Sequence, residues 1–438
     1  MIQAASTSIQ AGISRRLPDP YYIQYADDIL VFSTTKNQAV RTLICVLYAF
    51  SNVSGIQLNL NKTALVPFNL HPQQCSLLQS LLGCPATTLP IKYLGLPLTD
   101  RRPDRACFQS LIDKVASKLA GWKYRLLSRA GRVVLASSVL SSIPIYLMSV
   151  FSLPAWVIKN LDKVRRNFIW KGPHSSSKAI HLVSWDKMCL SKAYGGFGLI
   201  NLKLQNISLL IRWIWWLYKQ PASLWTYIAK QLYAKRDHNI PPLAWNAQGS
   251  FFWNDIFNLR LYFQLSTKSA VTSGSNTLLW YDNWGGNIFA FYGFENSMIP
   301  CKNITLKRAK SRLYSLFASA LTAVQAEKLA LVSLLPNSST PDTLFWRWRT
   351  DATYSASSLY KRLISVGKIS FHFLKLWKLK VPPSIRQFLV FLAHGRIMTQ
   401  DQLQKRHINF APQCNLCGEQ ILETQFHLFC DCTFAKAI

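Results

Sequence analysis

The chain has 438 residues, half of them hydrophobic, with 50 Lys and Arg against 19 Asp and Glu and a formal net charge of +31. This composition excludes an intrinsically disordered chain and supplies apolar surface for more than one hydrophobic core. A charge of one sign attracts polyanions, so nucleic acid is the expected partner. The alternative is that the basic runs near 101–105, 159–171 and 307–312 are only solvated helix faces.

The first hundred residues read as α/β. No apolar segment of a signal peptide follows Met1, so the ten cysteines are expected to be reduced thiols. Residues 21–33 predict a β-hairpin with Asp27 and Asp28 at its turn. A helix is predicted from near Thr35 to Gly55, followed by alternating apolar residues typical of a strand at 56–60 and a short extended run at 91–98.

The next part of the chain, 101–235, is helical and rich in tryptophan, and its segment 208–220 is apolar on nearly all sides, which predicts a buried helix. The uncharged stretch 133–158 is long enough to cross a membrane, but serines and prolines interrupt it and basic residues flank it. We therefore predict no membrane span here but a buried helix pair broken near Pro144 and Pro154.

Residues 236–344 are mixed and aromatic. The segment 276–284 predicts a strand, and the polar stretches near 266–275 and 334–342 predict breaks between domains.

Two adjacent carboxylates, Asp27 and Asp28, stand between apolar strand segments in a chain that is poor in acids. Neighbouring carboxylates repel each other, and a cation near them removes that repulsion. Magnesium prefers such oxygen ligands, and magnesium pairs bound by carboxylates activate the attacking oxygen in phosphoryl transfer. By spacing alone, a solvated turn is the alternative.

A second group of candidate ligands lies near the C-terminal end, in the stretch 414–432. Cys414 and Cys417 form a Cys-x2-Cys pair, and His427, Cys430 and Cys432 follow. Three thiolates and one imidazole suit tetrahedral zinc in a closed, structural site. The spacing from His427 favours Cys432 over Cys430 as the fourth ligand. A redox pair or buried thiols are the alternatives.

Several motifs in one order carry a resemblance to a known family. They are YADDILVFS (25–33), GIQLNLNKTAL (55–65), IKYLGLPL (91–98), LSRAGRVVLASSVLSSIPIYLMS (127–149), SKAYGGFGLINL (191–202) and CNLCGEQILETQFHLFCDC (414–432). The first resembles the catalytic palm hairpin of reverse transcriptases. The series as a whole resembles the C-terminal portion of plant non-LTR (LINE-type) retrotransposon reverse transcriptases, with the zinc-binding domain that follows the polymerase.

The resemblance implies a multidomain fold, α/β at first and then mainly α. Its parts would be a partial right-hand palm (1–100), a helical thumb and post-thumb region (101–235), a mixed connecting region (236–344) and a small zinc-binding module (345–438). It also implies an RNA template, a DNA primer or target, and a nuclear location.

The resemblance further implies roles for single residues. Asp27 and Asp28 would be the catalytic magnesium ligands, and Tyr25, Ala26 and Lys62 would bind the nucleotide.

A reverse transcriptase palm needs a further aspartate on an earlier strand, and no match to that motif is visible. A ribonuclease H carboxylate set and an endonuclease are not visible either, so we expect a fragment of the family's longer chain. Two hypotheses follow: a reverse transcriptase, or a catalytically inactive nucleic-acid-binding remnant with a structural zinc site. For the isolated chain the second is favoured, and a membrane-associated protein built around 133–158 is a third, outlying hypothesis.

Overall fold

The computed structural model describes residues 22–33, 37–119, 127–171, 180–234, 241–245, 250–279, 282–284, 304–312, 340, 342–365, 369–408 and 413–438. The chain divides into two compact units, one of Met1–Pro103 with Trp216–Phe251 and one of Asp104–Trp215 with Phe252–Ile438. The described residues form many helices and three small antiparallel sheets of two strands each. This mixture agrees with the predicted combination of α/β and mainly α segments.

The first unit begins with the predicted hairpin. β1 (Tyr22–Tyr25) pairs with β2 (Asp28–Val31) from Tyr22 opposite Val31 to Tyr25 opposite Asp28. The predicted helix follows as α2 (Asn37–Ser54), and the prediction that Gly55 ends it is confirmed. Gly55 has a φ of +71°, in the left-handed region that glycine tolerates best, and its N–H donates to the carbonyl of Ser51 at 2.9 Å.

The strand predicted at 56–60 is wrong. Residues 56–59 form no regular element, and Leu60 begins a turn. The side chains of Ile56, Leu58 and Leu60 are 63%, 44% and 41% exposed. The alternation of apolar residues is present, but within the described part of the chain no strand pairs with it, and an unpaired strand leaves its backbone groups without partners.

The rest of the first unit contains α3 (Pro72–Leu82), the hairpin of β3 (Ile91–Tyr93) and β4 (Leu96–Leu98), α10 (Leu224–Tyr233) and the short helix η4 (Pro242–Ala244). The β3–β4 pair confirms the extended run predicted at 91–98. Leu94 and Gly95 both have positive φ, +48° and +79°, which is typical of the two-residue turn that matches strand twist.

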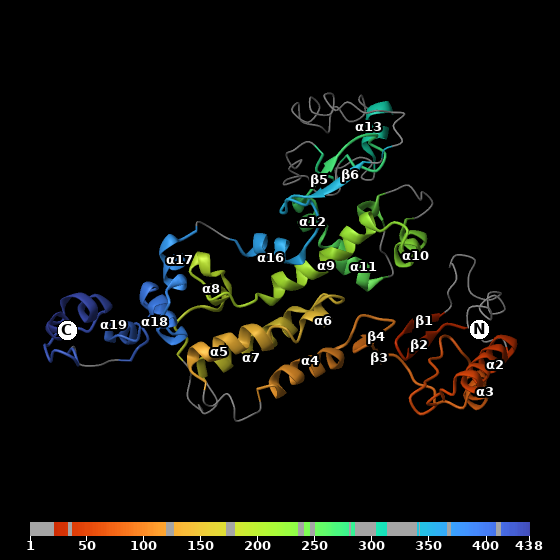
Figure 1. The fold of residues 1–438 in the computed structure, drawn as a ribbon, viewed down its shortest axis with the longest axis horizontal. Helices are drawn as coiled ribbons and strands as arrows, with labels where there is room; N and C mark the ends of the chain where they lie inside the picture. The colour runs from red at the N-terminus through yellow and green to blue at the C-terminus, as the bar shows by residue number, and fades with distance from the viewer. Residues whose placement is uncertain are drawn as a thin grey trace. The chain divides into compact units, whose positions relative to one another are not determined.

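The second unit contains the tryptophan-rich helices. They are α4 (Arg105–Ser117), α5 (Arg129–Leu135) continued by the π turn η2 (Ala136–Leu140), α6 (Ile145–Met148), α7 (Ala155–Lys171), α8 (Trp185–Cys189), η3 (Lys192–Tyr194) and α9 (Leu202–Lys219). Helices α4 and α5 both pack against α7, as the orange and yellow ribbons show (Figure 1). The predicted burial of 208–220 is confirmed for most of α9, where Leu210, Ile211 and Ile214 are fully buried.

The predicted breaks near Pro144 and Pro154 are confirmed, since α6 follows Pro144 directly and α7 follows Pro154. Buried Asn206 on α9 fixes the segment between them. Its Oδ1 accepts from the N–H of Leu153 at 2.8 Å, and its Nδ2 donates to the carbonyls of Met148 and Phe151, both at 2.8 Å. One side chain thus provides hydrogen bonds for three backbone groups that have no helical partner, because the helix is interrupted here. Among the described residues, no helix combines the length and the apolar character that a membrane crossing requires.

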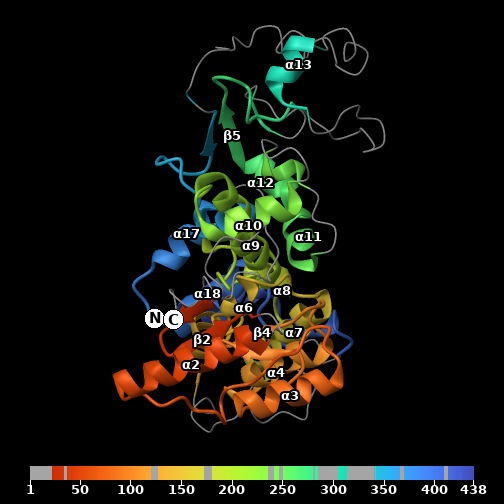
Figure 2. The same ribbon diagram turned by 90° about the vertical axis from the view of Figure 1, so that its right-hand side faces the viewer.

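The remaining elements of the second unit are α11 (Phe251–Phe257), α12 (Arg260–Ser266), β5 (Thr267–Ala270), α13 (Leu306–Arg312), β6 (Thr343–Trp346), α16 (Ala356–Ile364), α17 (Phe371–Lys378), α18 (Pro383–Ala393), α19 (Gln400–Gln404), η5 (His427–Asp431) and α20 (Thr433–Ala437). Helix α11 lies beside α9 in both views (Figures 1 and 2), where the rings of Phe252 and Trp213 meet edge to face at 5.4 Å. On the other side of α9, Trp215 contacts Trp346 of β6.

Two predictions for the connecting region are wrong. The stretch 266–275, predicted as a break, contains β5, which pairs with β6. The strand predicted at 276–284 is a single bridge, between Leu278 and Thr305, and residues 280–281 lie outside the described part. Most of the second predicted break, 334–339 and 341, also lies outside it.

The loop after β5 is closed by one carboxylate. Asp342 Oδ1 accepts from the N–H groups of Thr272, Ser273 and Gly274 at 2.8, 2.9 and 2.9 Å, and its Oδ2 accepts from the N–H of Asn276 at 3.0 Å and the hydroxyl of Thr277 at 2.9 Å. Partial burial raises the pKa of Asp342, but the hydrogen bonds from Thr272, Gly274, Thr277 and Asn276 outweigh it and hold that pKa below its usual value.

We therefore expect Asp342→Asn to open this loop. The amide places a donor where N–H groups already point, and the loss of such bonds costs about 1–3 kcal/mol. Because the folded-state pKa is lowered, the contribution of Asp342 is present above the unfolded-state pKa of about 3.9 and is lost as the pH falls through the folded value. The measurement is hydrogen–deuterium exchange of the peptide covering 267–277, in wild type and variant, from about pH 7 down to about pH 3.

The difference in exchange should be largest at neutral pH and shrink in acid. Comparing the two proteins at each pH removes most of the contribution of Asp282, whose pKa burial raises to about 7. Asp113→Asn, on the exposed face of α4, is the matched control and should leave the 267–277 peptide unchanged. Equal exchange of wild type and Asp342→Asn at neutral pH would contradict the role given to this carboxylate.

Candidate metal centres

Four of the five candidate zinc ligands come together in the structure. The side-chain ligand atoms of Cys414, Cys417, His427 and Cys432 all lie within 4.8 Å of one another. Cys414, His427 and Cys432 are buried, and Cys417 is half-buried. Cys430 is exposed and lies outside this cluster.

The first two thiols are positioned by a tight turn. The N–H of Cys414 donates to the carbonyl of Glu419 at 2.9 Å, and the N–H of Gly418 donates to the carbonyl of Cys414 at 2.9 Å. This turn requires a φ of +75° at Gly418, a conformation that other residues rarely adopt. The Cys-x2-Cys-Gly order in the sequence therefore folds into a loop with both sulfur atoms on one side.

The other two ligands lie at the two ends of one π turn, η5. The hydroxyl of Thr424 accepts the N–H of His427 at 3.1 Å, and the N–H of Cys432 donates to the carbonyl of His427 at 2.8 Å. A bond between residues five apart is the π-helical pattern, which is frequent at functional sites. The turn brings the side chains of His427 and Cys432 to one face, whereas Cys430 is exposed to solvent.

The surroundings of the cluster shift the pKa values of Cys414 and Cys417 in opposite directions. The backbone N–H of Cys417, and after it that of Leu416, lowers the pKa of Cys414 to about 7. The N–H of Glu419 acts to lower the pKa of Cys417, but burial and the thiols of Cys414 and Cys432 outweigh it and raise that pKa. The first proton thus leaves Cys414 easily, and the neighbouring thiols oppose the loss of a second.

The donor set fits zinc. Bond lengths of about 2.3 Å to sulfur and about 2.0–2.1 Å to nitrogen place a sulfur and a nitrogen ligand of a tetrahedral site about 3.6 Å apart. The distance from Cys417 Sγ to His427 Nε2 is 3.5 Å. Three soft sulfur donors and one imidazole favour zinc over magnesium or calcium, which prefer oxygen ligands.

Gln400 holds the two ligand loops together, and sequence reasoning missed it. Its Nε2 donates to the carbonyl of Gln413 at 2.6 Å, beside the first ligand, and its Oε1 accepts from the N–H of Glu423 at 3.2 Å, before the third. The side chain is buried at the start of α19. No spacing rule marks a glutamine in such a role, because it is defined only by the folded loops.

The predicted magnesium ligands lie at the tip of the first hairpin. Ala26, with a φ of +53°, and Asp27 form the turn, and Asp28 opens β2 opposite Tyr25. Asp27 and Asp28 are exposed, and the ring of Tyr25 is 66% exposed. Lys62 is exposed on a separate turn.

Within the described ranges, the two aspartates are not part of a larger ligand cluster. Among the residues that the structure describes, the zinc cluster alone unites three or more Cys, His, Asp or Glu side chains at ligand distance. The hairpin thus presents a pair of carboxylates to solvent, and no third carboxylate of the described part lies close enough to share a metal ion with them.

The glycines of the GGFG segment make a tight turn. Gly195 and Gly198 have φ values of +80° and +74°, and the N–H of Gly198 donates to the carbonyl of Leu190 at 2.9 Å. A Cβ on Gly196 would lie 1.9 Å from that same carbonyl oxygen. The segment is therefore a packing turn.

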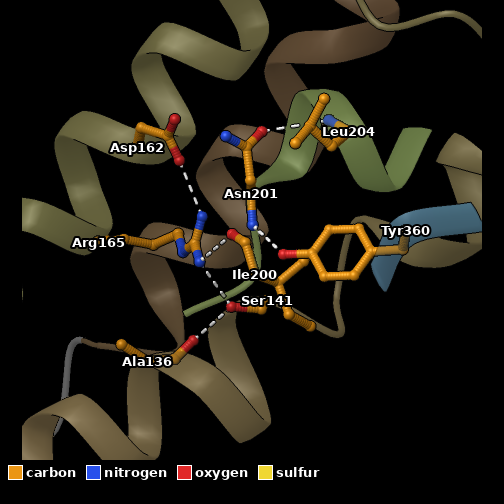
Figure 3. Close-up of polar contacts among 8 residues, drawn as sticks. All are labelled: Ala136, Ser141, Asp162, Arg165, Ile200, Asn201, Leu204 and Tyr360. Carbon is orange, nitrogen blue, oxygen red and sulfur yellow. Dashed lines mark hydrogen bonds and ion pairs between the residues drawn. The ribbon is translucent and has the colours of Figure 1, made fainter. Parts of the chain in front are cut away.

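A buried polar network joins the π turn η2 and Ser141 after it, α7, and the residues before α9 (Figure 3). The guanidinium of Arg165, with no exposed surface, donates to Asp162 at 2.8 Å, to the hydroxyl of Ser141 at 2.9 Å and to the carbonyl of Ile200 at 2.8 Å. Its carbon Cζ also lies 5.1 Å from the ring centroid of Trp185. Burial raises the pKa of Asp162, and Arg165 opposes that shift.

The network continues to α16. The N–H of Asn201 donates to the hydroxyl of Tyr360 at 2.9 Å, and the side chain of Asn201 caps α9 by accepting from the N–H of Leu204 at 3.1 Å (Figure 3). The hydroxyl of nearby Tyr354 donates to the carbonyl of Ser208 on α9. Two tyrosines thus tie the segment 354–360 to the helical core.

Comparison with known proteins gives two family matches. Residues 1–98 match the family of reverse transcriptases (RNA-dependent DNA polymerases), and residues 354–438 match the domain described as zinc-binding in reverse transcriptase. A "Putative ribonuclease H protein" of Arabidopsis thaliana is 28% identical over 359 residues, which are 77% of this chain and 56% of that protein. An "Uncharacterized mitochondrial protein" of the same plant is 26% identical over 144 residues, 33% of this chain and 92% of that protein.

These findings confirm the resemblance drawn from the sequence: residues 1–98 are similar to reverse transcriptases, residues 354–438 are similar to the zinc-binding domain found in them, and a plant protein resembles most of the chain. The chain spans about half the length of the first of these relatives. The family match and the Cys/His cluster together support zinc binding.

Proposed function

We propose that this chain is the nucleic-acid-binding part of a LINE-type reverse transcriptase, and that it holds an RNA template and a DNA primer or target through a basic surface and a zinc module. The observation that carries the proposal is the cluster of Cys414, Cys417, His427 and Cys432 at zinc distances, in a chain of net charge +31. In this proposal residues 1–100 are palm, 101–235 thumb and post-thumb, 236–344 a connecting region and 345–438 the zinc-binding domain. A nuclear location belongs to the same proposal.

The zinc ion would have a structural role. Four protein ligands close the coordination shell, which leaves no position for a water or a substrate. When bound, the ion would link the Cys414–Gly418 turn to the π turn η5, two loops that Gln400 already joins by hydrogen bonds. Its contribution would be folding energy for the module, because such sites do not form in unfolded chains.

Polymerisation is the second candidate function, and the hairpin favours it. Asp27 and Asp28 stand side by side at an exposed tip, where both carboxylates could reach magnesium, with Tyr25, Ala26 and Lys62 as the residues expected to contact the nucleotide. Two-metal phosphoryl transfer uses ions held about 3.5–4 Å apart by several carboxylates, and the described residues supply two. We therefore propose nucleic-acid binding for the isolated chain and a magnesium-dependent reaction only if a further carboxylate joins this pair.

Primer extension on an RNA template with magnesium tests the two candidates. We expect that the purified chain does not extend the primer. We also expect that it binds an RNA·DNA hybrid with an affinity that falls as the salt concentration rises. An Asp27→Asn, Asp28→Asn variant should bind the hybrid as tightly as wild type or slightly more tightly, because it removes two negative charges. Asp100→Asn, Asp113→Asn removes the same charge elsewhere and serves as the control.

Extension that is present in wild type and in this control, and absent in the Asp27, Asp28 variant, would establish polymerisation and contradict the expectation. Absence of any hybrid binding by wild type would contradict the proposed function itself.

A further inference from the structure

A group of basic side chains gathers within the second unit where α5 packs against α7 and where Arg406, after α19, reaches the carbonyl of His181. We call it the α5–α7 basic cluster, and its members are Arg129 and Arg132 on α5, Arg166 and Lys171 on α7, and Arg406 after α19. Helix α5 packs against both α7 and α18, so two of these elements are in direct contact. The cluster thus joins the helical core to the zinc-binding domain.

Aromatic rings hold the cluster together. The guanidinium of Arg129 lies 5.5 Å from the ring centroid of Trp170, on α7. The imidazole of His181 also contacts Trp170, stacked with a centroid distance of 5.9 Å and an angle of 15° between the rings. Arg406 donates to the carbonyl of His181 at 3.1 Å. A row of contacts therefore runs from Arg129 through Trp170 and His181 to Arg406.

The four arginines of the cluster form no ion pair with a carboxylate of the described part of the chain. Ion pairs of the described residues are formed elsewhere, for example by Arg165 with Asp162 and by Arg349 with Asp351. Asp162 acts on Arg166 through its charge, but its Oδ1 is hydrogen-bonded to Arg165 at 2.8 Å. In the sequence, the segments 120–126 and 172–179, which lie outside the described residues, contain no Asp or Glu.

The charges also act on each other. Burial lowers the pKa of His181, and the charges of Arg166, Lys171 and Arg406 lower it further. Burial also lowers the pKa of Arg129, with Arg132 adding to that shift. Like charges repel, so folding them into one place costs free energy that an anion would recover.

The ring of Trp170 is not available to stack on bases. Trp170 is 7% exposed, and Arg129, His181 and Phe391 lie against its ring. What the four arginines of the cluster offer to solvent is therefore guanidinium groups, since Arg129 is exposed and the other three are half-buried. The planar guanidinium matches the geometry of a phosphate, and phosphate contacts bind without reading sequence.

We propose that the α5–α7 basic cluster binds successive phosphates of the nucleic-acid backbone, so that one strand is held at the junction of the helical core and the zinc-binding domain. This inference rests on the proposed nucleic-acid-binding function and names the residues that would contact the backbone. Each phosphate contact releases counterions, so the cluster contributes directly to the salt dependence of binding.

The test is the affinity of the zinc-loaded full chain for an RNA·DNA hybrid over a range of salt concentrations. The variant is Arg129→Gln, Arg406→Gln, and the control is Arg349→Gln, Lys405→Gln, whose two charges are already paired with Asp351 and Asp401. Variant and control each remove two positive charges, so the long-range electrostatic attraction between chain and hybrid falls equally in the two proteins. We expect the slope of log affinity against log salt to fall by about 1–2 in the variant only, with affinity about tenfold weaker at low salt.

Equal slopes for variant and control, with circular dichroism and melting unchanged, would overturn this site and leave the proposed function in place. A wild-type chain without salt-dependent hybrid binding would overturn both. Polyglutamate that competes as well as the hybrid, per charge, would point to an acidic protein partner and would also overturn the proposal.

Discussion

Replacing Cys432 with serine is expected to abolish stoichiometric zinc binding and to unfold the module around α19, η5 and α20. Loss of a partner that only orients a ligand costs about 10–100-fold in metal affinity, so loss of a ligand itself should cost more. Because the unfolded chain holds no preformed site, the lost binding energy is lost folding energy. Bound zinc per chain, measured by mass spectrometry under native conditions, and exchange of the 413–438 peptide report the two effects.

Cys430→Ser is the matched control for this prediction. It makes the same chemical change two residues away, at an exposed thiol outside the cluster, and should retain one zinc per chain. A chelator added to wild type should reproduce the Cys432→Ser exchange pattern. Zinc loss in Cys430→Ser with retention in Cys432→Ser would reverse the ligand assignment.

Arg165→Met is expected to destabilise the second unit by about 3–5 kcal/mol, because it leaves buried partners without their cation. The carboxylate of Asp162, the hydroxyl of Ser141 and the carbonyl of Ile200 would each lose a hydrogen bond. Without the opposing charge, the pKa of Asp162 should rise further above its ordinary value. Urea denaturation, combined with hydrogen exchange of peptides covering 136–141 and 198–204, measures the loss and locates it.

A lysine two residues before Arg165 provides the control substitution. Lys163→Met, on the exposed face of the same helix, should change stability by less than about 0.5 kcal/mol. Adding Asp162→Asn to Arg165→Met should recover part of the loss, since it removes the unpaired buried charge. A double variant as unstable as the single one would show that lost packing, not the orphaned carboxylate, sets the cost.

Local signals in the sequence located the elements that depend on local interactions. The β1–β2 hairpin, the end of α2 at Gly55 and the breaks at Pro144 and Pro154 were predictable because a turn, a left-handed residue or a missing N–H defines each of them. The Cys-x2-Cys spacing marked the zinc cluster in the same way. Spacing favoured Cys432, and the π turn of η5 is what places it in the cluster and leaves Cys430 outside.

Elements that depend on a distant partner were not predictable. The alternation at 56–60 has strand periodicity but no pairing partner among the described residues, whereas the polar segment of β5 is a strand because β6 pairs with it. Arg165 and Arg166 look alike in a basic run of the sequence. Only the packing of α7 buries Arg165 and gives it three hydrogen-bond partners. Asp342 and Gln400 acquire their roles from loops far away in sequence.

The tyrosines of the segment 354–360 have a practical consequence for dissecting this protein. The zinc-binding match begins at residue 354, yet the hydroxyls of Tyr354 and Tyr360 are hydrogen-bonded to backbone groups of Ser208 and Asn201, and Trp346 packs against Trp215. A recombinant piece that starts at 354 would carry both tyrosines without their partners and would lack Trp346. The family boundary is therefore a poor cloning boundary, and the smallest expressible zinc module would have to include α9.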